Sequence, residues 1–252
     1  MPLRHDPAPP GGVRGTIATV VFTLLSNLVL LAITPSLALL GIVAAFVPPR
    51  GDWMMPVARL WSRLYLWASG VRLETDYDAA LDRARGVVFL ANHQSMVDVA
   101  VLMLTLPGQA RFVAKRSLFR IPFFGWSLSA AGFVPVDRSD VRSARASFAA
   151  AIELLRGGRS IVLFPEETRS TDGRLLPFKR GGVLLALKTG YPIVPVGIRG
   201  TRHVRPKGSW LTTPWRVRVR YGRPIEAAGG LAGRDELVTA VRAEIERLAF
   251  GD

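Results

Sequence analysis

The stretch that decides the fold is GVVFLANHQSMVDVAVLMLTL, residues 86–106. It begins with GVVFL, an apolar run that suits a strand buried on both faces of a parallel sheet. It ends with VAVLMLTL, which is typical of a buried helix. Between them lie His93 and Asp98, where the strand ends and the helix begins. The stretch therefore predicts one strand-to-helix unit of an α/β domain, with polar side chains in its turn.

Downstream, further short apolar runs alternate with helical stretches. The alternation predicts an α/β fold with a mixed, largely parallel sheet flanked by helices. WRVRVRY, residues 215–221, alternates strictly and predicts a half-buried strand with an arginine outer face. An apolar stripe in residues 235–248 predicts a closing helix. The other expected strands are 86–90, 111–114, 133–136, 160–164 and 192–198, and the expected helices between them are 97–105, 142–155 and 182–188.

Upstream, no charged residue occurs from Gly15 to Pro49. As one helix this stretch would be roughly 50 Å long, whereas the hydrocarbon core of a bilayer is about 30 Å thick. Pro35 is therefore expected to divide it into two helices, a hydrophobic two-helix membrane element. Two arrangements stay open: a spanning helix at 16–33 with a shorter interfacial one, or a re-entrant hairpin in one leaflet. Arginines flank the stretch on both sides, which favours the hairpin with both ends in the cytoplasm.

These patterns divide the chain into three segments. Residues 1–13 are rich in Pro and Gly and are expected to be disordered. Residues 14–70 are expected to form a hydrophobic and amphipathic helical segment that associates with the membrane, and 71–252 the α/β domain. Within the second segment, residues 53–71 form either an amphipathic helix at the membrane interface or an ordinary helix packed on the domain. The expected location is the inner, cytoplasmic membrane, with the domain facing the cytoplasm.

Composition limits the chemistry that the chain can perform. The formal net charge is +14 and the pI is about 11.4, which favours a polyanionic partner: nucleic acid, an anionic membrane surface or a phosphorylated substrate. Cys is absent, which excludes disulfides, thiolate ligands and a Cys nucleophile. No metal-ligand cluster is visible in the sequence. Because no zinc-finger or RNA-recognition signature accompanies the charge, nucleic acid is the least favoured partner.

His93 and Asp98 are candidates for a general base and the acid that orients it. The ordinary histidine pKa of about 6.5 suits proton transfer near neutral pH, and a carboxylate on the far ring nitrogen selects the tautomer. Positions i and i+5 of a regular helix are about 140° apart. The pair can therefore meet only if His93 lies in the turn and Asp98 in the first helical turn. Ser95, three residues before Asp98, suggests a capping box at the start of the helix. The alternative is that Asp98 only caps this helix and that His93 is a turn residue without a catalytic role.

LFPEETRS, residues 163–170, places Glu166, Glu167 and Arg169 after another expected strand. Ligands of α/β sheets bind at the carboxyl ends of strands, so this turn is expected to lie near His93. Arg169 carries a planar fork suited to phosphate. The alternative is a surface Glu–Arg pair of little consequence.

Further cations accompany apolar or Gly-rich segments. Lys115 and Arg138 bracket the apolar segment 118–126, which suits a ligand with an anionic head and an apolar tail. A core loop is the alternative. Lys179 and Arg180 precede a Gly-rich helix start, which is a candidate anion site.

Taken in order, these motifs resemble the four blocks of the glycerolipid acyltransferase family, and especially its bacterial 1-acylglycerol-3-phosphate acyltransferases. The matching text is NHQSMVD, the pair KRSLFRIPFFG and GFVPVDR, FPEETRS with PFKRGG, and PIVPVGI, within residues 86–225. The resemblance implies an α/β enzyme that works beside a lipid bilayer. It would move a fatty acyl group from acyl-CoA or acyl carrier protein to lysophosphatidate, without a cofactor or metal.

The resemblance also implies roles for individual residues. His93 would be the base and Asp98 the acid that orients it, while Arg169 and Glu166 would help to hold the acceptor. Weaker candidates for binding the phosphate or the CoA groups are Lys115, Arg138, Lys179 and Arg180.

One position departs from the family pattern. The family has Phe-Pro-Glu-Gly-Thr-Arg, and Glu167 stands in the place of the glycine. A glycine there permits unusual backbone angles or close approach of a ligand, whereas glutamate adds bulk and negative charge. The acceptor's identity is therefore open, and a related lyso-lipid such as a lyso-aminolipid is an alternative.

Two other function classes stay open. A serine hydrolase uses a Gly-x-Ser-x-Gly elbow, but GWSLS lacks the last glycine and no elbow surrounds Ser95. A lipid-binding membrane protein without catalysis would use the same residues to hold a lipid. Release of free CoA from acyl-CoA and a lyso-lipid separates an enzyme from such a carrier.

Overall fold

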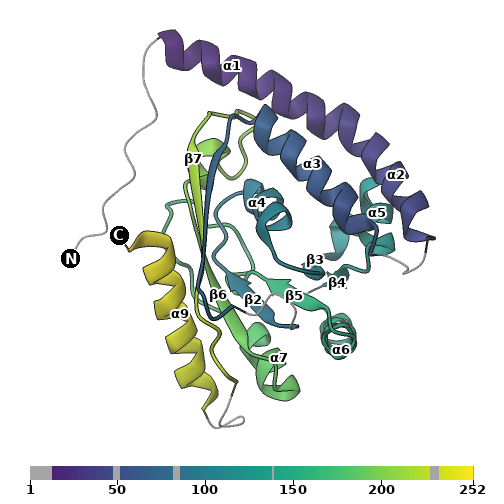
Figure 1. The fold of residues 1–252 in the computed structure, drawn as a ribbon, viewed down its shortest axis with the longest axis vertical. Coiled ribbons are helices and arrows are strands. Elements are labelled where there is room, and N and C mark those ends of the chain that lie inside the picture. The colour runs from purple at the N-terminus through teal and green to yellow at the C-terminus, as the bar shows by residue number, and fades with distance from the viewer. Residues whose placement is uncertain (1–12, 48–51, 82–85, 138, 228–232, 252) are drawn as a thin grey trace.

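The computed structural model describes residues 13–47, 52–81, 86–137, 139–227 and 233–251 (Figure 1). Arg138, and all but the last residue of the segment 1–13, lie outside the described residues. Within them the chain folds around one sheet, with helices on both of its faces (Figure 1).

The sheet has seven strands in the order β1-β7-β6-β2-β5-β3-β4. Every neighbouring pair is parallel except β6 and β7, so the predicted mixed, largely parallel sheet is confirmed. The sequence prediction missed β1, although its residues RLETDY alternate between polar and less polar side chains. The strands are β1 (Arg72–Tyr77), β2 (Val88–Ala91), β3 (Ala110–Lys115), β4 (Val134–Val136), β5 (Ser160–Leu163), β6 (Ile193–Arg199) and β7 (Arg216–Tyr221).

The two faces of the sheet bury alternate residues of each strand. On β2, Phe89 and Ala91 pack under α3 and α4, whereas Val88 and Leu90 pack under α6, α7 and α9. All these side chains are buried, which explains why β2 is apolar throughout. The helices expected at 97–105, 142–155, 182–188 and 235–248 are confirmed within a residue or two of their ends. The helices of the domain are α3 (Met54–Ala68), α4 (Val97–Thr105), α5 (Phe124–Ala130), α6 (Val141–Arg156), α7 (Gly181–Thr189), α8 (Thr201–Val204) and α9 (Arg234–Phe250), with a 3₁₀ turn, η2 (Arg116–Arg120), before α5.

The expected break at Pro35 is wrong. The chain continues from α1 (Val13–Leu28) through a π-helical stretch (Val29–Ile33) into α2 (Thr34–Ala45). Proline removes one backbone donor and crowds the preceding turn, and the wider π turn accommodates both effects. The Thr34 hydroxyl donates to the Val29 carbonyl at 3.0 Å, and Trp61 Nε1 donates to that hydroxyl at 2.8 Å. Contacts from α3 therefore support the turn that proline disturbs.

By length and composition alone, the stretch Gly15–Ala45 could cross a membrane as one helix. α3 runs back beside it, so a helical pair exists, but the reversal lies after α2 and not at Pro35 (Figure 1). α3 matches both interpretations of its sequence, because it packs on α4 and also exposes large apolar side chains. The outer surface of these helices is apolar and includes Leu24, Leu28, Leu31, Leu39, Leu40, Val43, Phe46, Trp53, Leu60 and Trp67.

Candidate active site

His93 lies in the turn between β2 and α4, and its ring meets the Asp98 carboxylate. His93 Nδ1 is 2.8 Å from Asp98 Oδ2, with Asp98 fully buried and the His93 side chain 17% exposed. Because an ionised carboxylate only accepts hydrogen bonds, Nδ1 carries the proton in this pair and Nε2 is left as an acceptor. The pair thus has the geometry of a general base whose tautomer is selected by an acid.

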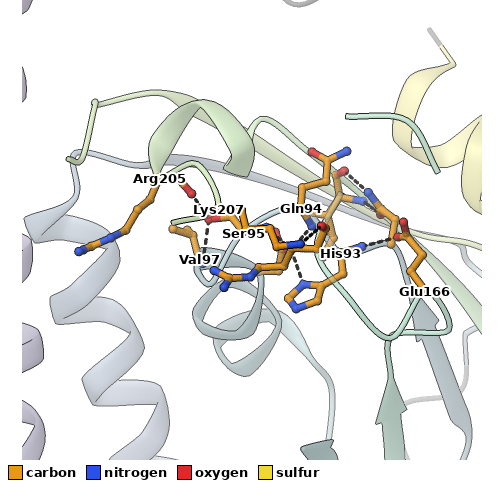
Figure 2. Close-up of polar contacts among 11 residues, drawn as sticks. His93, Gln94, Ser95, Val97, Glu166, Arg205 and Lys207 are labelled. Atoms are coloured by element: carbon orange, nitrogen blue, oxygen red, sulfur yellow. Dashed lines mark hydrogen bonds and ion pairs between the residues drawn. The ribbon is translucent and has the colours of Figure 1, made fainter. Parts of the chain in front are cut away.

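Backbone groups hold the Asp98 carboxylate in place. Its Oδ2 also accepts the N–H groups of Gln94 at 2.7 Å and Ser95 at 2.9 Å (Figure 2). The bond from Ser95 is the acid's half of a capping box. The other half differs from the expected form, because Ser95 Oγ accepts from the Val97 N–H at 3.2 Å instead of the Asp98 N–H. The acid therefore both starts α4 and orients His93.

Two residues that sequence reasoning missed fasten this turn to the sheet. The Asn92 side chain donates to the Ile198 carbonyl at 2.8 Å and accepts the Ile198 N–H at 2.7 Å, which extends the pairing of β2 with β6. The Phe164 ring, at the end of β5, stacks on the His93 ring with centroids 4.0 Å apart. The position of Asn92, two residues after the expected strand 86–90, was the available signal, whereas no local pattern marks Phe164.

Glu166 supports His93 through the backbone. Its Oε1 accepts the His93 N–H at 2.7 Å and its Oε2 accepts the Leu176 N–H at 2.8 Å (Figure 2). The side chain is 4% exposed, and this burial raises the pKa of the Glu166 carboxyl, although both hydrogen bonds oppose the shift. Because backbone groups occupy both oxygens, the carboxylate joins the His93 turn to the segment after Arg174.

The loop after β5 carries Glu167 and Arg169 beside this carboxylate. Glu167 has a φ of 60°, a left-handed conformation that favours glycine. Lys207, from the segment after α8, donates to the Arg169 carbonyl at 3.1 Å and to Thr168 Oγ1 at 3.2 Å. Lys207 was missed because its partners lie far away in the sequence. It adds a cation to the loop that bears the Arg169 guanidinium.

The remaining candidate cations are distributed along the carboxyl edge of the sheet. Lys115 ends β3 and is exposed, and Lys179 precedes α7. Arg180 turns to α9 instead, where its Nε lies 3.4 Å from Asp235 Oδ1. Arg138 lies outside the described residues. The structure therefore brings His93, Asp98, Glu166 and the Arg169 loop together, with Lys115 and Lys179 at the same edge.

A cavity of about 380 Å³ lies beside the loop after β5, on the face of the sheet under α6 and α7. Glu167 and Lys179 line it, and Phe164, which stacks on His93, forms part of its wall. The other lining side chains are mostly apolar: Val113, Val136, Ala144, Ser147, Phe148, Ala151, Leu163 and Leu185. Within the described ranges, no three His, Asp or Glu side chains form a metal-binding group.

Comparisons with known proteins agree with this geometry. A family model described as Acyltransferase matches residues 73–199. The chain is 35% identical over 187 residues to a chloroplastic 1-acyl-sn-glycerol-3-phosphate acyltransferase of Arabidopsis thaliana, covering 74% of this chain and 52% of that protein. It is 30% identical over 191 residues to the 1-acyl-sn-glycerol-3-phosphate acyltransferase of Pseudomonas aeruginosa, covering 74% and 73%.

A solved structure is also similar. The crystal structure of the 1-acyl-sn-glycerophosphate acyltransferase of Thermotoga maritima superposes with a TM-score of 0.76 and 26% identity, covering 93% of this chain and 94% of that one. The chain spans about half the length of the chloroplastic relatives that it matches. The chain therefore belongs to the acyltransferase family that includes the 1-acyl-sn-glycerol-3-phosphate acyltransferases.

Proposed function

We propose that this protein is an acyltransferase that moves a fatty acyl group to the free hydroxyl of 1-acylglycerol-3-phosphate, giving phosphatidic acid. The acyl donor would be acyl-CoA or acyl carrier protein. The observation that carries the proposal is the 2.8 Å contact between His93 Nδ1 and Asp98 Oδ2, which leaves Nε2 available as a base. The same reaction is named for the relatives from plants and bacteria.

In the proposed reaction, His93 Nε2 takes the proton from the acceptor hydroxyl, and Asp98 stabilises the imidazolium that forms. The acceptor oxygen attacks the thioester carbonyl directly and forms the new ester bond. The carbon–sulfur bond then breaks, and the leaving thiolate takes the proton back from His93. Direct transfer needs no enzyme-bound acyl group, which suits a chain without Cys.

The charges around His93 suit a phosphorylated acceptor. Arg169 presents a guanidinium on the loop beside Glu166, and the Lys207 ammonium lies against the same loop. Lys115 adds a third cation at this edge. Guanidinium and ammonium groups are the usual partners of phosphate oxygens. We assign Glu166 to the positioning of His93 and not to direct contact with the acceptor, because its oxygens already accept backbone N–H groups.

Apolar surface for the acyl chains lies on both sides of the site. The cavity beside Phe164 has a mostly apolar lining, and the segment 118–126 exposes Leu118, Ile121, Phe123 and Trp126. That segment packs against α2, so it continues the apolar outer surface of the N-terminal helices. We propose that these surfaces meet the cytoplasmic leaflet of the inner membrane, with the site facing the cytoplasm, and that the basic chain is attracted to anionic lipids.

The experiment is an acyl-transfer assay with purified protein. Lysophosphatidate and other lyso-lipids are each offered with acyl-CoA and with acyl carrier protein, and free thiol and lipid product are both measured. We expect thiol release matched by phosphatidic acid, and its loss in His93→Ala. Thiol release without a new lipid would instead indicate a hydrolase, and absence of both products would contradict the proposal.

Glu167 favours a second candidate acceptor. It places a carboxylate at the cavity beside Phe164, the ring that stacks on His93, at a position where the family pattern has glycine. A lyso-lipid with an amino group in its head would complement that charge. The same assay decides between the two acceptors, because a lyso-aminolipid would then give the higher kcat/KM.

A further inference from the structure

Arg205 is a buried cation that pairs with no acidic side chain among the described residues. It follows α8, and 2% of its surface is exposed. Its Nη2 donates to Asn27 Oδ1 at 2.8 Å, its Nε donates to the Ser209 carbonyl at 3.2 Å, and its guanidinium lies 5.5 Å from the centre of the Trp210 ring. None of the Asp or Glu side chains that the structure describes pairs with it. Its partners are all neutral.

Tyr65 of α3 lies beside this cation and does not supply a negative charge. Burial raises the pKa of the Tyr65 phenol above its ordinary value, and the charge of Arg205 only partly opposes the shift. The phenol is therefore neutral at physiological pH. Among the described groups, Arg205 Nη1 has no hydrogen-bond partner. A buried cation without a counter-charge contributes little net stability, so we look to its hydrogen bonds for a positioning role.

The main chain of Arg205 is joined to the catalytic turn. Ser95 Oγ donates to the Arg205 carbonyl at 2.6 Å. The Ser95 N–H in turn donates to Asp98 Oδ2 at 2.9 Å, the same oxygen that meets His93 Nδ1. Figure 2 shows the Arg205 side chain pointing away from His93 while its backbone faces the Ser95 turn. One hydrogen bond to a serine thus separates the Arg205 peptide from the acid that orients the base.

Two residues further on, Lys207 holds the other loop of the site. Its bonds to the Arg169 carbonyl and the Thr168 hydroxyl fix the loop that presents the Arg169 guanidinium. The segment 205–207 therefore contacts both the turn that moves the proton and the loop that we expect to bind the acceptor.

On its other side the same segment is anchored to α1. Asn27, which receives the Arg205 guanidinium, also donates to the Trp210 carbonyl at 3.3 Å. Ser26 Oγ donates to Thr212 Oγ1 at 2.9 Å. The neighbouring residues of α1 that face outward are apolar and exposed. The helix that we expect in the membrane is therefore tied to the site through residues 205–212.

We propose that Arg205 is a positioning residue for acyl transfer. By anchoring the segment 205–207 to Asn27 of α1, it fixes the position of the hydrogen-bonded residues Ser95, Asp98 and His93 relative to the Arg169 loop. It touches neither substrate. The inference rests on the proposed function, because this relative position affects turnover only if His93 acts as the base. The inference goes beyond that function because it assigns the geometry of the site in part to Arg205, a residue packed against the N-terminal helix.

The test replaces the guanidinium with an apolar side chain of similar length. We expect Arg205→Met to lower kcat about ten- to a hundredfold, because misplacing a reacting group by about 1 Å has an effect of that size. The KM for the acyl donor should stay unchanged, and the Tm should change little, because removal of a buried unpaired charge offsets the loss of its two hydrogen bonds. Arg205→Lys keeps the charge and should restore part of kcat. A merely structural role predicts instead a lower Tm with normal kcat in the folded fraction.

A second readout does not depend on activity. In histidine-labelled protein, the proton on His93 Nδ1 should give a downfield, exchange-protected NMR signal, which Arg205→Met should weaken or abolish. Thr19→Val is the matched control, because the Thr19 hydroxyl lies 3.4 Å from that of Thr213 in the same interface but outside the chain to Ser95. It should change neither kcat nor the signal.

The outcomes separate the inference from the proposed function. If the wild-type protein transfers no acyl group, the function is wrong, but the NMR signal still tests the coupling. If Arg205→Met does not fold, Asn27→Ala carries the test, since it leaves the cation in place and removes its partner on α1 together with the bond from Asn27 to the Trp210 carbonyl. A folded Arg205→Met or Asn27→Ala protein with wild-type kcat and an unchanged His93 signal would overturn the inference.

Discussion

The turn after β2 and the loop after β5 lie side by side at the carboxyl edge of the sheet, yet they are held in different ways. In the first, Asp98 accepts hydrogen bonds from His93, Gln94 and Ser95, all within a few residues of it. In the second, the Arg169 carbonyl depends on Lys207, which comes from another part of the chain. The Asp98 carboxylate of the first is therefore bonded by near neighbours in the sequence, whereas the carbonyl of the second is bonded by a distant residue, although both regions also have other long-range contacts.

This difference suggests that the two regions have separate roles in the reaction. A locally bonded turn keeps one geometry, which suits a proton transfer that tolerates little displacement. A loop held by an exposed lysine and carrying Glu167 in a strained conformation can vary with the acceptor. We therefore expect changes in the first region to lower kcat and changes in the second to alter KM or the choice of acceptor.

The largest effect is expected for His93→Asn, which removes the base but keeps a donor toward Asp98. We expect kcat to fall by about 10²–10⁴, the usual contribution of a general base, with little change in Tm. His203→Asn, on α8 where the ring lies beside Trp215, is the control and should keep its activity. Near-normal turnover in purified His93→Asn protein would refute the role of His93.

Glu166→Gln should break the link between the two regions. Glutamine offers one acceptor oxygen where the carboxylate offers two, so either the His93 or the Leu176 N–H loses its partner. We expect kcat to fall about tenfold, as for the loss of one buried hydrogen bond of about 1–3 kcal/mol. Unchanged kcat would show that the backbone holds His93 without this carboxylate.

The same variant should change how stability depends on pH. Burial raises the pKa of Glu166 in the folded protein, so folding favours the protonated carboxyl. Its contribution is therefore fully present below the ordinary glutamate pKa and is lost as pH rises through the folded-state value. The Tm of the wild type relative to Glu166→Gln should fall as pH rises through this range and then level off. A difference that grows with pH would contradict the sign.

Lys207→Met tests the loop after β5 alone. Removing two bonds to the loop should raise the KM for a phosphorylated acceptor about three- to tenfold, as expected for about 1 kcal/mol of lost positioning. The kcat and the KM for the donor should change little. Lys188→Met, on α7 where the ammonium lies over the Phe148 ring, is the matched control for the loss of one charge. A three- to tenfold fall in kcat with an unchanged KM for the acceptor would instead show that Lys207 supports the catalytic turn.

Glu167→Gly and Glu167→Ala should give the smallest effects and together separate backbone strain from charge. Alanine removes the carboxylate and keeps a side chain at a φ of 60°, whereas glycine removes both. We expect the glycine variant to be more stable than the alanine variant by about 1 kcal/mol, measured by denaturant unfolding. If the carboxylate selects the acceptor, both variants should shift kcat/KM toward lysophosphatidate. A shift in the Glu167→Gly variant alone would show that the volume of the side chain, and not its charge, limits the acceptor.

Sequence alone determined the parts of this protein that depend on close neighbours. The buried strands, the helices between them and the strand with an arginine face follow from short apolar periods, as β2 and β7 show. The contact of His93 with Asp98 was expected on the condition that His93 lies in the turn and Asp98 in the first helical turn, and the structure meets that condition. Regular patterns and bonds between near neighbours act over a few residues, so they can be read from the chain.

Tertiary structure alone decided the features that join distant segments. α1 and α2 continue past Pro35 with support from Trp61 of α3, Glu166 binds the backbone of His93, and Lys207 holds the Arg169 loop. The cavity beside Phe164 likewise needs β3, β4, β5, α6 and α7 together. Each contact joins residues that become neighbours only when the sheet assembles, and no local pattern marks them beforehand. The chemistry of the base is therefore local, whereas its support and the shape of the substrate site are properties of the whole fold.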